Sequence, residues 1–422
     1  MVRTKWRQPP PGDGVRMIRP GSRTILFLAQ KGFGQHAFSS LVASLTIALA
    51  AGLFLSTFKI KEEANKAFSN ASGGFDAVLG ARGSKLQLIL NALFHLEASP
   101  GNLSWEQYET ILKTPGVREA FPIAVGDNYL GYRLVGTLPN LFTDHQWRPG
   151  ENYKVQKGGR IFTDSAKEAL VGSMVARKLK LKIGDRFHPY HGLTYKEESK
   201  HSDIYVVVGL LEATGTPADR VIWIPIKGIQ LMEGHDASMA QSVSAVLLTL
   251  KGAAGFSLDL KYNKQGDRAT LAWPVASILG SFFNKLNWFE DVLSLVAYMV
   301  AFIGSMIIFA TLRSAMNERI REFAILRCLG ASRRDVTFVV LAQSIMISFL
   351  GALGSLLFSF VIHSITARLI REQTGVVMEG IAIDQATITT FFALLLIGLL
   401  SGLLPALQAY RVNLSENLKP RT

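Results

Sequence analysis

The chain has 422 residues, of which 49% are hydrophobic and 18% are charged, and its formal net charge is +13. The charged fraction is below the ~25% of soluble domains. The mean hydropathy of +0.24 excludes a disordered chain and an ordinary cytosolic enzyme, and it predicts a membrane protein with a sizeable soluble part. The single cysteine, Cys328, excludes an internal disulfide, so any external domain must be stabilised by its own core.

The N-terminal segment 1–36 is strongly basic, since it contains seven lysines and arginines and a single acidic residue, Asp13. We expect this segment to be cytoplasmic. Within it, Ser22 precedes a stretch of apolar and basic residues that reaches Gly32. These caps predict a short interfacial helix that lies along the inner leaflet, and a loop is the alternative.

The first apolar segment, 37–58, is long enough to span a bilayer, which requires about 20 residues of helix. A cleaved signal peptide is the alternative, but no small-x-small cleavage site follows the segment. Small residues recur at every fourth position on one face of this helix, and such faces let two helices approach closely. We predict a subunit seam here, with ordinary helix packing as the alternative, and the residues are Ser44, Ala48, Gly52 and Ser56.

Segment 59–291 has the composition of a globular domain. It opens with a charged helical pattern over 59–69 and returns to the membrane over 284–291, so we expect a stalk at each end. A helix pattern over 105–113 and β-branched runs over 120–125, 204–211 and 242–250 predict an α+β domain. The glycine-rich stretch 73–84 is interpreted as a flexible joint or a contact for cargo.

Residues 188–203 contain three of the eight histidines together with several carboxylates. Two imidazoles three residues apart, with a third imidazole and a carboxylate nearby, can satisfy a tetrahedral Zn²⁺ site. A polar surface loop is the alternative, because the spacing matches no standard metal motif. The predicted ligands are His188, His191, His201 and Asp203.

Three further apolar segments, 292–312, 336–363 and 386–407, follow the globular part. The loop 313–335 and the tail 408–422 both carry an excess of basic residues, so the positive-inside rule places them in the cytoplasm with the N-terminus. An even number of spans then places 59–291 and the short loop 364–385 outside. The positive charge is therefore a signal of topology, and we predict no binding to nucleic acid.

The loop 313–335 has the most specific pattern in the chain. Apolar residues at helical spacing precede Gly330, which supplies a helix C′ position, and Ser332 with Asp335 forms a capping box for the next helix. A helix, a sharp turn and a re-entering helix suit docking into a cleft on a cytoplasmic partner. A solvated hairpin is the alternative from spacing alone.

Several kinds of catalytic chemistry are absent from the sequence. It contains no Gly-x-x-x-x-Gly-Lys-Ser/Thr, no His-Glu-x-x-His and no Gly-x-Ser-x-Gly motif. The four apolar segments have essentially no ionisable side chains, which argues against an ion-coupled transporter, a channel or an intramembrane protease. We therefore predict a protein that is not itself an enzyme.

The stretch Arg-Glu-Phe-Ala-Ile-Leu-Arg-Cys-Leu-Gly-Ala-Ser-Arg-Arg-Asp over 321–335 resembles the signature of the FtsX/MacB/LolC-type ABC transporter permeases, the type VII systems. Residues 403–418 resemble the C-terminal span and tail of that family, and residues 169–185 resemble its periplasmic core domain. The order of one span, a large external domain and three spans is also similar. The resemblance implies four transmembrane helices plus an α+β extracytoplasmic domain of the MacB-core type.

The resemblance also implies a function. Such a permease lies in the inner membrane, pairs with a second copy or a paralogue, and docks on a cytoplasmic ABC ATPase dimer that holds ATP and Mg²⁺. It passes motion to its periplasmic domain (mechanotransmission), with a periplasmic protein and membrane lipid as further partners. The substrate class is a lipoprotein, an amphipathic compound or a peptide.

The loop that corresponds to the family's coupling helix contributes the predicted ATPase-coupling residues, which are Glu318, Arg321, Glu322, Phe323, Arg327, Gly330, Ser332 and Arg333. The alternative function is a membrane-anchored sensor or scaffold whose external domain binds a ligand, with a link to zinc and without transport.

Overall fold

The computed structural model describes residues 22–410 except 36, 233–239, 267, 286, 319, 329, 379, 381 and 382. The chain divides into two units. Lys59–Trp288 and Ser364–Gly380 form one of them, which we call the globular unit, and the remaining described residues form the helical unit. The globular unit ends close to the predicted boundary at 291, and it also takes in part of the segment predicted as a short loop.

Among the described residues, four helices are long and apolar enough to cross a membrane, over Ala37–Phe68, Asp291–Ser314, Arg333–Thr374 and Gln385–Gln408, and the first and third of them also contribute residues to the globular unit. The four predicted spans each fall within one of these stretches. The helices concerned are α2 (Ala37–Asn70), α10 (Asn287–Glu318), α12 (Arg333–Thr374) and α13 (Gln385–Tyr410), and the shorter helices are α1 (Ser22–Gln35) and α11 (Ile320–Cys328).

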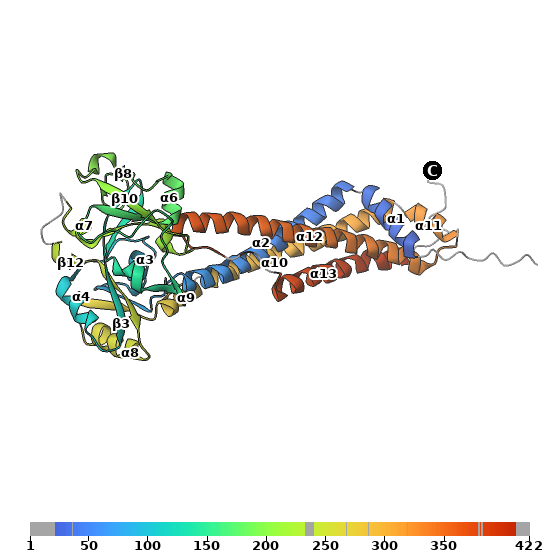
Figure 1. The fold of residues 1–422 in the computed structure, drawn as a ribbon. Coiled ribbons are helices and arrows are strands. Elements are labelled where there is room, and N and C mark those ends of the chain that lie inside the picture. Colours follow the sequence, from blue (N-terminus) through green and yellow to red (C-terminus); the bar gives the residue numbers. More distant parts are fainter. Residues whose placement is uncertain are drawn as a thin grey trace, which may run out of the picture. The chain divides into compact units, whose positions relative to one another are not determined.

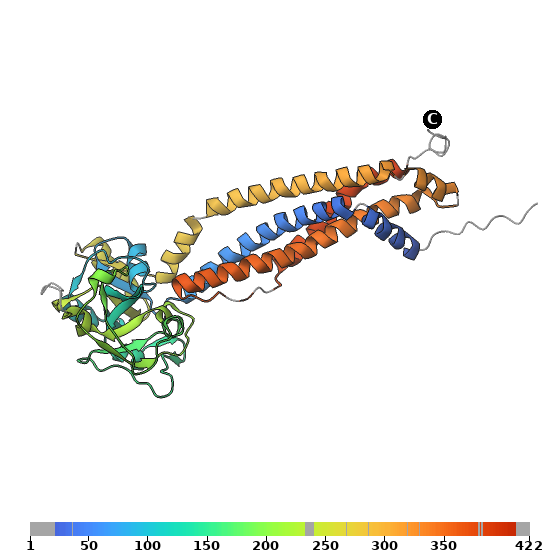
Figure 2. The same ribbon diagram turned by 90° about the horizontal axis from the view of Figure 1, so that it is seen from above.

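The four long helices run alongside one another in both views (Figures 1 and 2), and an apolar cluster with members from each of them holds them together. Ile47 of α2, Ile308 of α10, Ile347 of α12 and Leu394 of α13 all belong to this cluster. Large apolar side chains are exposed elsewhere on the same helices, as expected of surfaces that face lipid.

Two helices are longer than the sequence predicts. Helix α12 continues through 364–374, part of the segment that the sequence predicts to be a loop, because residues 364–374 contain no glycine or proline. Gly375 has a φ of +78°, the left-handed conformation that ends helices. Helix α1 likewise passes through Gly32 and ends at Gln35, so Gly32 does not terminate it.

The globular unit is built on a ten-stranded mixed sheet with the order β14-β1-β13-β3-β4-β11-β7-β10-β8, and β9 pairs with β3. Strand β10 is parallel to β7 and β11 is parallel to β4, while the other pairings are antiparallel. Helix α6 lies toward one end of the sheet, near β8 and β10, and α4 and α8 lie toward the other (Figure 1). Two further two-stranded sheets pair β12 with β2 and β5 with β6.

The strands of this unit are β1 (Ala77–Ala81), β2 (Leu103–Ser104), β3 (Val117–Tyr129), β4 (Tyr132–Thr137), β5 (Gln146–Arg148), β6 (Glu151–Asn152), β7 (Glu168–Val171), β8 (Arg186–Phe187), β9 (Tyr190–His191), β10 (Tyr205–Leu210), β11 (Ile222–Pro225), β12 (Ser242–Val243), β13 (Ala245–Leu250) and β14 (Ala269–Ala272). Its α-helices are α3 (Lys85–Ala92), α4 (Trp105–Leu112), α5 (Asn140–Asp144), α6 (Ser173–Leu179), α7 (Ile226–Gln230), α8 (Ala254–Asp259) and α9 (Val275–Lys285). The short helices are η1 (Glu197–Ser199), η2 (Pro217–Arg220) and η4 (Leu260–Lys264).

Both faces of the main sheet are buried. Along β1, Val78 belongs to one core cluster while its neighbours Ala77 and Leu79 belong to another, as the alternation of side chains along a strand requires. A strand that is buried on both faces has no polar face, so it reads as a continuous apolar run. This fact corrects the flexible-joint interpretation of 73–84, because that stretch contains β1, which lies between β14 and β13.

The structure confirms the α+β class and several local predictions. Helix α4 begins at Trp105, and Ser104 and Gln107 form a complete capping box, since each side chain bonds the other's backbone N–H. The predicted strands at 120–125, 204–211 and 242–250 overlap β3, β10 and β13.

Candidate functional site

The turn between α11 and α12 is closed by hydrogen bonds at both of its ends. At the end of α11, the Ala331 N–H donates to the Leu326 carbonyl at 3.0 Å, and Gly330 has a φ of +109°. At the start of α12, the Asp335 N–H donates to Ser332 Oγ at 3.2 Å and the Ser332 N–H donates to Asp335 Oδ2 at 2.7 Å. The predicted capping box is therefore present, and hydrogen bonds within the turn itself fix its conformation.

One face of α11 packs against the rest of the helical unit. Phe323 is 2% exposed, and it clusters with Val336 and Val339 of α12 and with Ala406 of α13. The structure thus corrects the prediction for Phe323. Its side chain anchors α11 in the chain's own core, so it is not on a surface that can dock onto another protein.

The opposite face of α11 is exposed. It presents Arg321, Glu322 and Ile325, and Ile325 is 45% exposed although it lies in an apolar run. The sequence analysis did not select Ile325, but the helical period identifies it, because it falls outside the face of Phe323. We call Arg321, Glu322 and Ile325 the exposed face of α11.

The other predicted coupling residues lie around this face. Ser332 and Arg333 are exposed at the start of α12, and the Arg333 guanidinium lies 5.6 Å from the centre of the Tyr410 ring. Arg327 and Gly330 are half-buried. The side chain of Glu318 lies outside the described residues.

The stripe of small residues on α2 contacts α12 of the same chain. Ser44 and Ala48 are each 6% exposed and Ser56 is 1% exposed, and Ser44 Oγ donates to the Ile347 carbonyl at 3.0 Å. A Cβ atom at Gly52 would meet Phe358 Cδ1 at 2.8 Å. The structure therefore corrects the prediction of a subunit seam at Ser44, Ala48, Gly52 and Ser56, because α12 already covers this face.

The chain segments next to the membrane-spanning stretches contribute buried side chains to one core cluster of the globular unit. Ala71 after α2, Val275 and Leu279 of α9, and Val376 after α12 are all buried in it. The rings of Phe68 of α2 and Phe283 of α9 pack at a tilt of 56°, with 5.5 Å between their centres, and Ile370 of α12 packs against the same cluster. We call this set of contacts the anchor.

Hydrogen bonds and a close approach of the backbone reinforce the anchor. The Val377 N–H donates to the Gly215 carbonyl at 3.3 Å, and a Cβ atom at Gly375 would meet the Thr216 carbonyl oxygen at 3.0 Å. Next to the end of α2, His145 Nε2 lies 2.6 Å from the Gly73 carbonyl oxygen. The ends of α2 and α12 are therefore both fixed to the globular unit.

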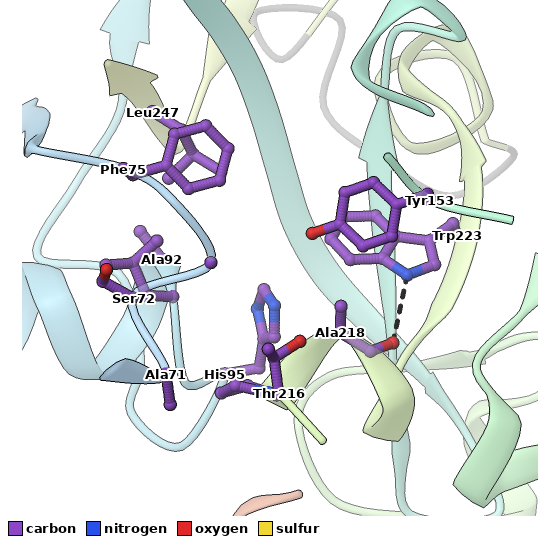
Figure 3. Close-up of a pocket in the computed structure, with 13 residues that line it drawn as sticks. Ala71, Ser72, Phe75, Ala92, His95, Tyr153, Thr216, Ala218, Trp223 and Leu247 are labelled. Carbon is purple, nitrogen blue, oxygen red and sulfur yellow. Dashed lines mark hydrogen bonds between the residues drawn. The ribbon is translucent and has the colours of Figure 1, made fainter. Parts of the chain in front are cut away.

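A small cavity of about 20 Å³ lies within the anchor, and this volume fits a single water molecule. Figure 3 shows His95 between Ser72, which follows α2, and Thr216 and Ala218, which flank the start of η2. The Trp223 indole N–H donates to the Ala218 carbonyl at 3.3 Å. Burial, with the charges of Arg133 and Arg220, lowers the pKa of His95 from 6.5 to about 3, so this histidine is neutral at neutral pH.

The histidine cluster predicted as a metal site is only partly assembled. His191 and His201 approach the carboxylate of Asp127, and the three candidate ligand atoms lie within 4.8 Å of one another. The other two predicted ligands point elsewhere. His188 Nδ1 contacts the His201 carbonyl oxygen at 3.2 Å, and Asp203 pairs with Lys167. The prediction is therefore wrong for His188 and Asp203, which lie outside the cluster, and the carboxylate within the cluster is that of Asp127.

Family models match both the globular part and the C-terminal helical part of the chain. A model of the MacB-like periplasmic core domain matches residues 40–257, which is just over half of the chain, and a model of the FtsX-like permease C-terminal region matches residues 294–414. The periplasmic region of MacB from Actinobacillus actinomycetemcomitans aligns with 52% of this chain and 98% of its own, at 12% identity and a TM-score of 0.34.

Two curated relatives are also similar. The probable syringafactin export ATP-binding/permease protein SyfD of Pseudomonas syringae is 28% identical over 159 residues, covering 38% of this chain and 24% of its own length. The macrolide export ATP-binding/permease protein MacB of Haemophilus ducreyi is 23% identical over 256 residues, covering 59% of this chain and 36% of its own length. The chain thus spans about a quarter of the length of SyfD and just over a third of the length of this MacB.

Proposed function

Because the chain belongs to the MacB/FtsX-type family of ABC transporter permeases, we propose that it transmits motion from an ATPase to its globular unit and so drives export or extraction of an envelope substrate. ATP and Mg²⁺ bind to that ATPase. These 422 residues contain no P-loop with which to bind them. The assembly contains an ATPase dimer and a second copy or paralogue of the permease. The substrate is a lipoprotein, an amphipathic compound or a peptide.

The proposal places the complex in the inner membrane, with both termini in the cytoplasm and the globular unit in the periplasm. The excess of arginine and lysine at the N-terminus, in the loop 313–335 and in the tail supports this orientation. The relatives SyfD and MacB are named as export ATP-binding/permease proteins, and this combination supports the pairing with an ATPase.

The anchor is the observation that carries the proposal. Helices α2 and α12 each contribute residues to both units, and their ends pack into the same core cluster as α9. A packed core transmits strain because it is dense and has few alternative arrangements. A displacement of these helices is therefore expected to move the globular unit and not to be absorbed by a flexible linker.

The exposed face of α11 is the proposed docking surface for the ATPase. The capped turn and the buried Phe323 hold α11 against the other helices of its own unit, so a force on the exposed face is passed to α12. Arg321 and Glu322 supply charges of both signs around the apolar Ile325, which gives the partner a specific orientation.

Purification of the full chain from its native membrane tests this docking surface. We expect an ATPase to co-purify with the unmodified chain, and we expect Ile325→Glu and Glu322→Lys to weaken the association by roughly tenfold or more, as hot-spot changes do. Cys328→Ser is the control, because Cys328 is exposed one turn further along α11 and the substitution adds no charge and little volume.

Three results decide the matter. Loss of the ATPase in the two variants, with retention in Cys328→Ser, supports the proposal. Retention of the ATPase in all variants shows that α11 is not the docking surface. Absence of any ATPase from the unmodified complex contradicts the transport function and favours a sensor or scaffold.

A further inference from the structure

Three side chains from separate segments of the globular unit meet at one side of the sheet. Asp127 comes from β3, His191 from β9, and His201 from the chain after η1. Asp127 Oδ1 lies 3.4 Å from His191 Nδ1 and 3.3 Å from His201 Nε2. One carboxylate oxygen of Asp127 therefore contacts two imidazole nitrogens. The farther histidine in the chain, His201, is 74 positions from Asp127.

The two distances from Asp127 Oδ1 match those between neighbouring ligand atoms of a single zinc ion, and all three candidate ligand atoms lie within 4.8 Å of one another. With Zn–N and Zn–O bonds of about 2.0–2.1 Å and tetrahedral angles, neighbouring ligand atoms lie about 3.3–3.4 Å apart. A direct N–H···O hydrogen bond is usually shorter, with a mode near 2.9–3.0 Å. The donor set, two imidazoles and a carboxylate, is one that Zn²⁺ accepts in proteins.

Two of the three groups are buried, and the third is exposed to solvent. Asp127 is 0% exposed and His201 is 8% exposed, whereas the His191 side chain is 60% exposed. The exposed His191 leaves one side open, through which an ion can enter and a water can serve as the fourth ligand.

The backbone around the cluster holds the ligands in register. Asp127 and His191 are paired residues of β3 and β9. The Asn128 amide donates to the carbonyl oxygens of Tyr190 and Gly192, and the His201 N–H donates to the Pro189 carbonyl at 2.9 Å. The three ligands therefore need little rearrangement to bind an ion.

We propose that Asp127, His191 and His201 form a Zn²⁺ site with three protein ligands and one open position. Bound zinc joins the segment 188–201 to β3, the strand that also pairs with β4 and β13 in the centre of the sheet. The site is independent of the docking surface on α11, so it stands or falls separately from the transport proposal.

Isothermal titration of the full chain in detergent tests the proposal, with zinc chloride added after treatment with a chelator and removal of the chelator. We expect saturable binding of one zinc per chain. Removing a direct ligand by His191→Ala or Asp127→Asn is expected to weaken binding by more than roughly a hundredfold, beyond the 10–100-fold effect of groups that only support a ligand.

His188→Ala and Asp203→Asn are the matched controls, because both residues lie in the same segment and neither belongs to the cluster. Both are expected to bind zinc as the unmodified chain does. His191→Ala keeps the test decisive if Asp127→Asn fails to fold, since His191 is exposed. Absence of saturable heat, or unchanged binding in His191→Ala, overturns the proposal.

Discussion

Acidification is expected to destabilise the globular unit through His95. The folded protein holds His95 neutral, with a pKa of about 3, whereas an unfolded histidine has a pKa near 6.5. As the pH falls below 6.5, the unfolded chain gains a proton at this site that the folded chain does not. Stability is therefore present in full above pH 6.5 and is lost as the pH falls from 6.5 toward 3.

The size of the effect follows from the difference between the two pKa values. Between pH 7 and pH 5 the unfolded histidine changes from mostly neutral to almost fully protonated, which costs the folded state about 2 kcal/mol. This figure does not depend on the exact folded pKa so long as it lies well below 5. For a unit of this size, about 2 kcal/mol corresponds to a fall in melting temperature of roughly 4–8 °C.

Thermal unfolding of the full chain in detergent at pH 7 and pH 5 measures this effect, and His95→Gln serves as the comparison. The variant removes the titrating group, so the pH-dependent part due to His95 is the difference between the two proteins. We expect the melting temperature of His95→Gln to fall by less between pH 7 and pH 5 than that of the unmodified chain. Equal falls in the two proteins would refute the reasoning, whatever the absolute stability of the variant.

Three further predictions concern close packing. Gly80→Ala places a Cβ atom 2.3 Å from Leu88 Cδ2 and should destabilise the globular unit by about 1–3 kcal/mol, which a lower urea midpoint would show. In the control Gly131→Ala the new Cβ atom meets no atom within 4 Å, so this variant reports only the strain of the positive φ. Gly52→Leu should separate α2 from α12 and lower the yield of folded chain in detergent. Gly304→Ala should leave the yield unchanged, because its new Cβ atom makes ordinary contacts of 3.6 Å or more. Equal yields of the two variants would contradict the packing of α2 against α12. Val376→Ala removes buried methyl groups from the anchor at a cost of about 2 kcal/mol, and faster proteolysis within 364–380 would reveal the loosened segment; unchanged cleavage would count against the anchor.

The sequence predicts features that depend on neighbouring residues. The four spans follow from hydropathy, the capped turn at Ser332 follows from residues three apart, and α4 follows from Ser104 and Gln107. Each of these signals acts within one or two helical turns, so no knowledge of the tertiary structure is needed to recognise it.

The features that the sequence analysis misassigned depend on distant contacts. The spacing of small residues on α2 indicates close packing but does not identify the partner, which proves to be α12. Strand β1 has no alternating pattern, because the sheet buries both of its faces. Asp127 joins His201 from 74 positions away, so no local spacing could have selected it instead of Asp203.

The central claim is that ATP hydrolysis moves the globular unit through its anchor. Amide hydrogen exchange in the complex of this chain with its ATPase measures that movement directly, with and without nucleotide. The account predicts that ATP changes the exchange of segments 64–75, 214–221 and 370–377, and that Ile325→Glu abolishes this change. Unchanged exchange in all three segments while the bound ATPase hydrolyses ATP would contradict it.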